Sequence, residues 1–245
     1  MDVMLFNRCD TRSRYIRRAR KVGAETRLMS TYVSEIRKVL KESGKNFAVF
    51  VEPMLPTGYP DCVVVEYDAK AYDRRKECPR QSELNRKVRF VVMKHGGIRS
   101  DELSSLLGYT EDSVVESLKA LREVGLVRLH AGRWYAVKRC DGIKKITAIE
   151  GKLTGWKKAV EQAVVDSTFA NESYILMPKV TDRAMEYAKH SGVGVYAKPK
   201  SKFFSVMVPA LPVEAASHIG LYFDEWICNR LHSIRELRKE KNACV

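Results

Sequence analysis

The sequence predicts an α/β fold, because apolar segments rich in β-branched residues alternate with segments of helical periodicity. The first helix, 28–43, has one apolar face and is stopped by Gly44. Strands are expected at 47–52, 61–67, 146–152, 173–177, 192–196 and 203–208, and further helices at 156–169, 181–189 and 213–239. With 245 residues, the chain can form one or two domains with a real core.

Residues 83–138 look like a separate module. Helix caps at Ser100 and Thr110 and glycine stops divide it into three helices, followed by a hairpin. This order resembles a winged helix-turn-helix domain. We therefore expect one domain made of 1–82 and 139–245, with 83–138 inserted, and we interpret 68–82 as a linker. The third helix begins with acidic residues, so the hairpin is the better expected DNA contact, and protein docking is an equally good role.

Neither a membrane span nor a secretory signal is expected. The sequence has no run of eighteen apolar residues, and its N-terminal apolar run is too short for a signal peptide. The six cysteines show no CxxC spacing. We interpret them as reduced thiols of a cytoplasmic protein.

The net charge of +14 favours a polyanionic partner, with simple solubility as the alternative explanation. Residues 1–48 contain twelve Lys/Arg against five Asp/Glu, which accounts for half of the excess. A solvated, flexible terminus explains the charge of this segment equally well. The expected nucleic-acid contacts are Arg12, Arg14, Arg17, Arg18, Arg128, Arg133, Lys198 and Lys200.

Two predicted strands carry residues suited to metal chemistry. Glu150 and Lys152 are two positions apart, so both side chains point to one face of their strand. Asp61 begins another strand. Two carboxylates suit a hard cation such as Mg²⁺, and the lysine suits the positioning or deprotonation of a water molecule.

Pro60-Asp61 and Glu150-Gly151-Lys152, with the order of elements around them, resemble the PD-(D/E)xK nuclease superfamily. The pattern is most similar to archaeal Holliday-junction resolvases and related small nucleases, over residues 28–67 and 141–178. The resemblance implies a restriction-endonuclease-like fold, in which helices flank a mixed central sheet. It also implies a metal-dependent DNA nuclease, either an endonuclease or an exonuclease.

The resemblance further implies roles for particular residues. Asp61, Glu150 and the carbonyl of Gly151 would hold Mg²⁺, with Mn²⁺ as an alternative, and Lys152 would orient the attacking water. Gln162, on the following helix, would orient Lys152 or the phosphate. Glu35, on the first helix, would complete a second metal position.

Three alternatives and conditions stay open. Asp61 and Glu150 are 89 residues apart, so the resemblance requires the ends of the inserted module to lie close together. The same fold also serves as an inactive scaffold, so a DNA-binding regulator is the alternative function. The apolar stripe Phe223, Ile227, Leu231 and Ile234 allows for a homodimer.

Overall fold

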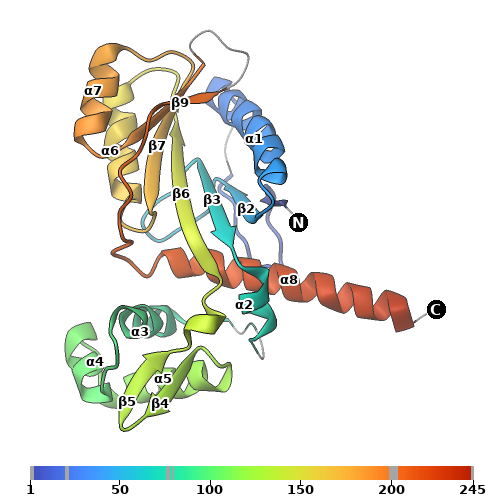
Figure 1. Ribbon diagram of the computed structural model, residues 1–245, viewed down its shortest axis with the longest axis vertical. Helices are drawn as coiled ribbons and strands as arrows, with labels where there is room; N and C mark the ends of the chain where they lie inside the picture. The colour runs from blue at the N-terminus through green and yellow to red at the C-terminus, as the bar shows by residue number, and fades with distance from the viewer. Residues whose placement is uncertain (1–2, 20–21, 76–77, 79, 199–203, 244–245) are drawn as a thin grey trace. The chain divides into compact units, whose positions relative to one another are not determined.

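The computed structural model describes residues 3–19, 22–75, 78, 80–198 and 204–243. The chain forms two compact units (Figure 1). The sheet unit comprises Met1–Thr11, Tyr15–Tyr67 and Ile143–Ala216, and the helical unit comprises Arg12–Arg14, Asp68–Gly142 and Ser217–Val245. The expected boundaries differ, since 68–82, 139–142 and the C-terminal helix belong with the helical unit. The reason is a set of buried ion pairs that tie these segments to that unit, described below.

A mixed sheet of seven strands forms the sheet unit, in the order β1-β2-β3-β6-β7-β8-β9. Its strands are β1 (Val3–Phe6), β2 (Asn46–Val51), β3 (Cys62–Tyr67), β6 (Ile143–Gly151), β7 (Glu172–Met177), β8 (Gly194–Ala197) and β9 (Ser205–Val208). β1–β2, β6–β7 and β7–β8 pair in parallel, and the other neighbours pair antiparallel. The α/β class and the mixed central sheet are therefore confirmed.

Helices cover both faces of this sheet (Figure 1). On one face α1 (Ala24–Glu42) packs Met29, Tyr32 and Val33 against strand residues that include Cys62 and Ile149. On the other face α6 (Trp156–Asp166) and α7 (Asp182–His190) contribute to a second apolar cluster, with residues of β7, β8 and β9. The two faces thus have separate cores, and strand alternation decides which side chains enter each one.

The segment between β3 and β6 leaves the sheet and returns at the same point. Tyr67, the last residue of β3, pairs with Ile143, the first of β6. Next to this pair, the N–H of Asp68 donates to the carbonyl of Gly142 at 2.7 Å. A Cβ atom at Gly142 would overlap the ring of Tyr72, so only glycine fits there. The ends of the insertion are therefore adjacent, as the sequence-based argument requires.

The helical unit contains the three helices and the hairpin expected from the sequence. They are α3 (Glu83–Lys94), α4 (Ser100–Leu107), α5 (Glu111–Glu123), β4 (Val127–His130) and β5 (Arg133–Ala136). Their apolar faces form one cluster that includes Leu103, Leu118 and Trp134. α2 (Ala69–Asp73), in the region expected to be a linker, and α8 (Gly220–Ala243) complete the unit together with a 3-10 turn at Lys138–Cys140.

Phe223 and Ile227 are fully buried within the chain, so half of the apolar stripe is not exposed, and the homodimer stays a prediction. The expectation of reduced thiols is wrong for one pair of cysteines. Cys78 and Cys228 form a disulfide rather than two separate thiols. Spacing rules could not find this pair, because 150 residues separate the two cysteines. Among the described residues, no helix is long and apolar enough to cross a membrane.

Candidate functional site

Pairing of β3 with β6 brings Asp61 to the Glu150 end of β6. The two strands are antiparallel, and Cys62 lies opposite Ile149, so the start of one strand meets the end of the other. The Asp61 carboxylate accepts a hydrogen bond from the backbone N–H of Gly151 at 3.0 Å. Asp61 and Glu150 are both buried, with 4% and 3% of their surface exposed. The structure therefore joins the two sequence motifs at the ends of two adjacent central strands of the sheet.

Strand alternation decides which face Glu150 occupies. Its neighbour Ile149 packs into the α1 cluster, so Glu150 points to the opposite face, which α6 covers. Ile175 of β7, paired with Glu150, also belongs to the α6 cluster. Burial raises the pKa of the Glu150 carboxyl group, and the positive charge of Lys152, two residues further along the chain, opposes this increase. The predicted acid and amine therefore act on each other.

A third carboxylate, Asp166, joins this site and was not predicted. It lies on the buried side of α6 with Ala159 and Ala163, at helical spacing. Burial raises the pKa of Glu150, and the nearby charges of Asp166 and Asp61 raise it further. Burial and Asp61 likewise raise the pKa of Asp166. The sequence contains one indication that Asp166 belongs to the site. Asp166 lies one helical turn after Gln162, on a helix face that is otherwise apolar.

The side chain of Gln162 also places a polar atom, its amide oxygen, in the protein interior. Its side-chain oxygen is buried without a hydrogen-bond partner among the described residues, and one carboxylate oxygen of Asp166 is in the same condition. Buried polar atoms normally have partners, and such exceptions mark positions where a ligand, an ion or water completes the bonding. α6 therefore carries two buried oxygen atoms, one of Gln162 and one of Asp166, that can accept a hydrogen bond or bind an ion.

Glu35 does not belong to this group, which corrects the expected second metal position. Its carboxylate forms an ion pair with Lys198 at 2.6 Å and accepts from the N–H of Phe204 at 3.1 Å. α1 packs on the face of the sheet opposite to that of Glu150. The helical pattern showed that Glu35 edges the apolar side of α1, but it could not show which sheet face this side covers.

Several expected nucleic-acid contacts have partners within the protein. Arg17 binds the buried Glu52 through two nitrogens, at 3.2 and 3.0 Å. Arg14 lies 3.6 Å from Glu225, and Lys198 is held by Glu35. Arg18 lies over the ring of Tyr59. Arg12 is at the surface, and Lys200 is outside the described residues. Arg17 and Lys198 therefore have structural roles that the expectation of a free basic arm did not include.

A basic groove lies within the helical unit. It has a volume of about 750 Å³, and the described residues that line it include Arg74, His95, Arg128, Lys138 and Arg139 but no Asp or Glu. The guanidinium of Arg128 lies 4.9 Å from the centre of the Tyr135 ring, which also lines the groove. Arg133 is not part of this lining and instead donates to the carbonyl of Gly97 at 3.1 Å. We call this surface the wing groove, because the β4–β5 hairpin contributes to it.

The carboxylate site combines three buried carboxylates, and oxygen is the donor type that Mg²⁺ and Mn²⁺ prefer. Among the described residues, one Asp166 oxygen has no hydrogen-bond partner. The three carboxylates do not all reach within 4.8 Å of one another as a ready three-ligand group. The expectation that Asp61, Glu150 and the Gly151 carbonyl hold Mg²⁺ therefore stays a prediction.

Without metal, the stability of the protein is expected to fall as the pH rises above about 4.5, the ordinary pKa of a glutamate. There the unfolded chain releases the protons of Glu150 and Asp166, while the folded protein retains them because both pKa values are raised. The unfolded state then binds fewer protons, so the free energy of unfolding decreases with pH. Thermal unfolding in chelator, from about pH 5 to about pH 8, measures this slope. Glu150→Gln should flatten it, and an equal slope in that variant would contradict the assignment.

Comparisons with protein-family models, with curated proteins and with solved structures gave no match to this chain. The fold and the site define an α/β protein with a mixed seven-stranded sheet and a buried carboxylate cluster at the ends of its central strands.

Proposed function

We propose that the protein is a magnesium-dependent DNA nuclease of the PD-(D/E)xK type, with a restriction-endonuclease-like sheet unit. The observation that carries this proposal is the 3.0 Å hydrogen bond from the N–H of Gly151 to the Asp61 carboxylate. It places the Pro-Asp motif against the Glu-x-Lys motif, although Asp61 and Glu150 are 89 positions apart in the sequence. Lys152 and the two α6 oxygens that have no hydrogen-bond partner among the described residues support the same function.

Each residue has a defined task in phosphodiester hydrolysis. A bound divalent ion supplies Lewis-acid chemistry and lowers the pKa of a water molecule. Asp61 and Glu150 would hold this ion, and its positive charge would offset the repulsion between the two buried carboxylates. Lys152 orients the attacking water or stabilises the negative charge that develops on the phosphate. Gln162 offers an amide that can orient Lys152 or the phosphate.

The helical unit is proposed to be a winged helix that holds the DNA through the wing groove. Cationic side chains bind the phosphate backbone without reading sequence, which suits an accessory substrate contact. The start of α5 carries Glu111 and Asp112, so conventional insertion of this helix into the major groove is disfavoured.

Incubation of the purified chain with linear and branched DNA, with Mg²⁺, Mn²⁺ or chelator, tests the proposal. Cleavage that requires the divalent ion is the expected result. Salt-sensitive DNA binding without cleavage under any of these ions would instead favour the alternative function, a DNA-binding regulator on an inactive nuclease scaffold. Absence of both binding and cleavage would reject both readings.

The double variant Arg128→Ala/Arg139→Ala is expected to weaken DNA binding by the protein. Loss of two phosphate contacts should reduce the slope of log K against log salt by about 2. Fluorescence anisotropy with labelled duplex DNA at several salt concentrations measures this. The matched control is Lys119→Ala/Arg122→Ala, which removes two exposed cations from α5 outside the groove. A larger effect in the control would place the DNA on α5 instead.

A further inference from the structure

A second set of metal-ligand side chains lies in the helical unit and plays no part in the proposed nuclease site. Among the described residues, Cys78, Cys228 and His232 are the group of three whose ligand atoms lie within 4.8 Å of one another. Cys228 and His232 are one turn apart on α8, and Cys78 comes from the segment between α2 and α3. In the structure the two cysteines are joined as a disulfide, with their Cα atoms 5.8 Å apart.

His232 supplies an independent indication of a ligand. Its Nε2 atom is buried and has no hydrogen-bond partner among the described residues. A buried imidazole nitrogen without a partner is uncommon, since such atoms usually bond to protein, water or metal. Burial also lowers the pKa of His232, which favours the neutral ring that binds metals.

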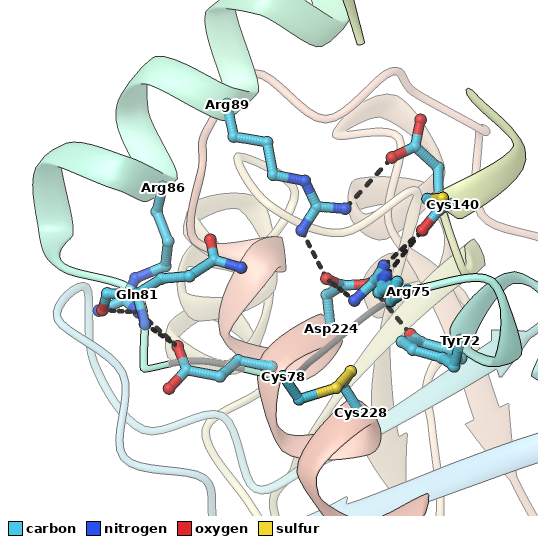
Figure 2. Close-up of polar contacts among 11 residues, drawn as sticks. Tyr72, Arg75, Cys78, Gln81, Arg86, Arg89, Cys140, Asp224 and Cys228 are labelled. Carbon is cyan, nitrogen blue, oxygen red and sulfur yellow. Dashed lines mark hydrogen bonds and ion pairs between the residues drawn. A yellow bond between two sulfur atoms is a disulfide. The ribbon is translucent and has the colours of Figure 1, made fainter. Parts of the chain in front are cut away.

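Contacts other than the disulfide hold both cysteine segments together (Figure 2). Arg75, three residues before Cys78, binds Asp224, one turn before Cys228, through two nitrogens at 2.8 and 2.7 Å. Three residues after Cys78, the N–H of Gln81 donates to Glu225 at 3.4 Å. The two thiols would therefore stay near each other after reduction, because these contacts do not depend on the S–S bond.

We propose that Cys78, Cys228 and His232 form a redox-controlled zinc site when the disulfide is reduced. A dithiol reductant breaks the S–S bond by giving two electrons and two protons, and it is itself oxidised to a disulfide. Zn²⁺ then binds the two sulfurs and the imidazole, and the two thiol protons go to solvent. Two thiolates and one imidazole are a donor set that zinc prefers, and water takes the fourth, open position. The disulfide form has no thiolate, so it cannot hold the ion.

This site differs in chemistry from the carboxylate cluster, and its test does not depend on nuclease activity. Sulfur and nitrogen ligands select zinc, whereas an all-oxygen cluster selects magnesium or manganese. The full chain is reduced with a phosphine, freed of reductant without oxygen and titrated with Co²⁺, whose thiolate complexes absorb visibly. Zn²⁺ is then added to displace the Co²⁺. We expect one ion per chain in the reduced protein and none at this site in the oxidised protein.

The variants separate ligand loss from unfolding. Cys228→Ser should remove the thiolate–Co²⁺ absorption, and His232→Ala should weaken Zn²⁺ binding at least about 100-fold, since loss of even an outer-shell partner costs up to about that much. His232→Ala keeps the disulfide, so its fold can be verified in the oxidised form. Cys9→Ser, in an exposed cysteine outside the group, is the matched control. Absence of the thiolate absorption in reduced wild-type protein, or equal zinc affinity in His232→Ala, would overturn the proposal.

Discussion

Glu150→Gln is expected to abolish Mg²⁺-dependent cleavage of DNA while leaving DNA binding intact. The amide keeps the shape of the side chain but lacks the charge that holds the cation. We expect a rate loss of at least about 1,000-fold, because tenfold in rate corresponds to about 1.4 kcal/mol and metal catalysis supplies several kcal/mol. Initial cleavage rates at saturating Mg²⁺, compared with anisotropy binding curves in Ca²⁺, measure the two effects separately.

A measurement of the stability of Glu150→Gln distinguishes loss of the metal ligand from unfolding of the protein as the cause of lost cleavage. Glu150 lies buried near Asp166 and Asp61, whose charges raise its pKa. Removing one of these mutually repelling groups should make metal-free Glu150→Gln at least as stable as the wild type above neutral pH. A variant that loses both activity and stability would therefore point to a structural role for Glu150, and full activity would reject the nuclease assignment.

Two further variants locate the chemistry. Lys152→Ala should lose cleavage to a similar extent but retain binding of the divalent ion, because the lysine is not a ligand. Glu35→Gln should cleave normally, since Glu35 is engaged by Lys198 and the N–H of Phe204. Glu186→Gln, an exposed position on α7, serves as the matched control. Strong loss of activity in Glu35→Gln would restore that residue to the metal site.

Asp224→Asn is expected to destabilise the helical unit by about 3–5 kcal/mol. The Asp224 side chain is 1% exposed and binds Arg75 and Arg89, whose side chains are 2% and 1% exposed. Tyr72 also donates to it at 3.1 Å (Figure 2). Neutralising the shared carboxylate leaves two guanidinium groups buried without a full counter-charge, which costs much more than the loss of a surface ion pair.

Urea unfolding followed by tryptophan fluorescence measures this change, because Trp134 and Trp226 both lie in the helical unit. Asp112→Asn, at the exposed start of α5, is the control and should cost no more than about 1 kcal/mol.

Acid unfolding gives a second readout of the contribution of Asp224 to stability. Burial would raise the pKa of Asp224, but Arg75 and Arg89 hold it below its ordinary value, so its stabilising effect is lost as the pH falls below about 3.8. Unchanged stability in Asp224→Asn would show that the network is energetically neutral.

The order of helices and strands was accessible from the sequence, because periodicity, caps and glycine stops are local signals. They placed the Asp61 and Glu150 strands, the three helices of 83–138 and the hairpin after them. The boundaries shifted by a few residues, and β1 and α2 were not expected, since both are short and lie in polar surroundings. The resemblance to the PD-(D/E)xK pattern supplied the idea that residues 61 and 150 meet, and the pairing of β3 with β6 brings them together.

Local periodicity by itself determined the α/β class and placed Glu150 in a strand. Lys152, expected on the same strand, lies one residue beyond the end of β6 at Gly151. Only the tertiary structure showed which face of the sheet each helix covers. α6 packs on the face of Glu150 and brings Asp166 to the site, whereas α1 packs on the opposite face and holds Glu35 away from it. The tertiary structure also decided that α8 belongs with residues 68–142, through Arg75, Arg89 and Asp224. These contacts join residues about 135 to 150 positions apart, and no local pattern carries information over such distances.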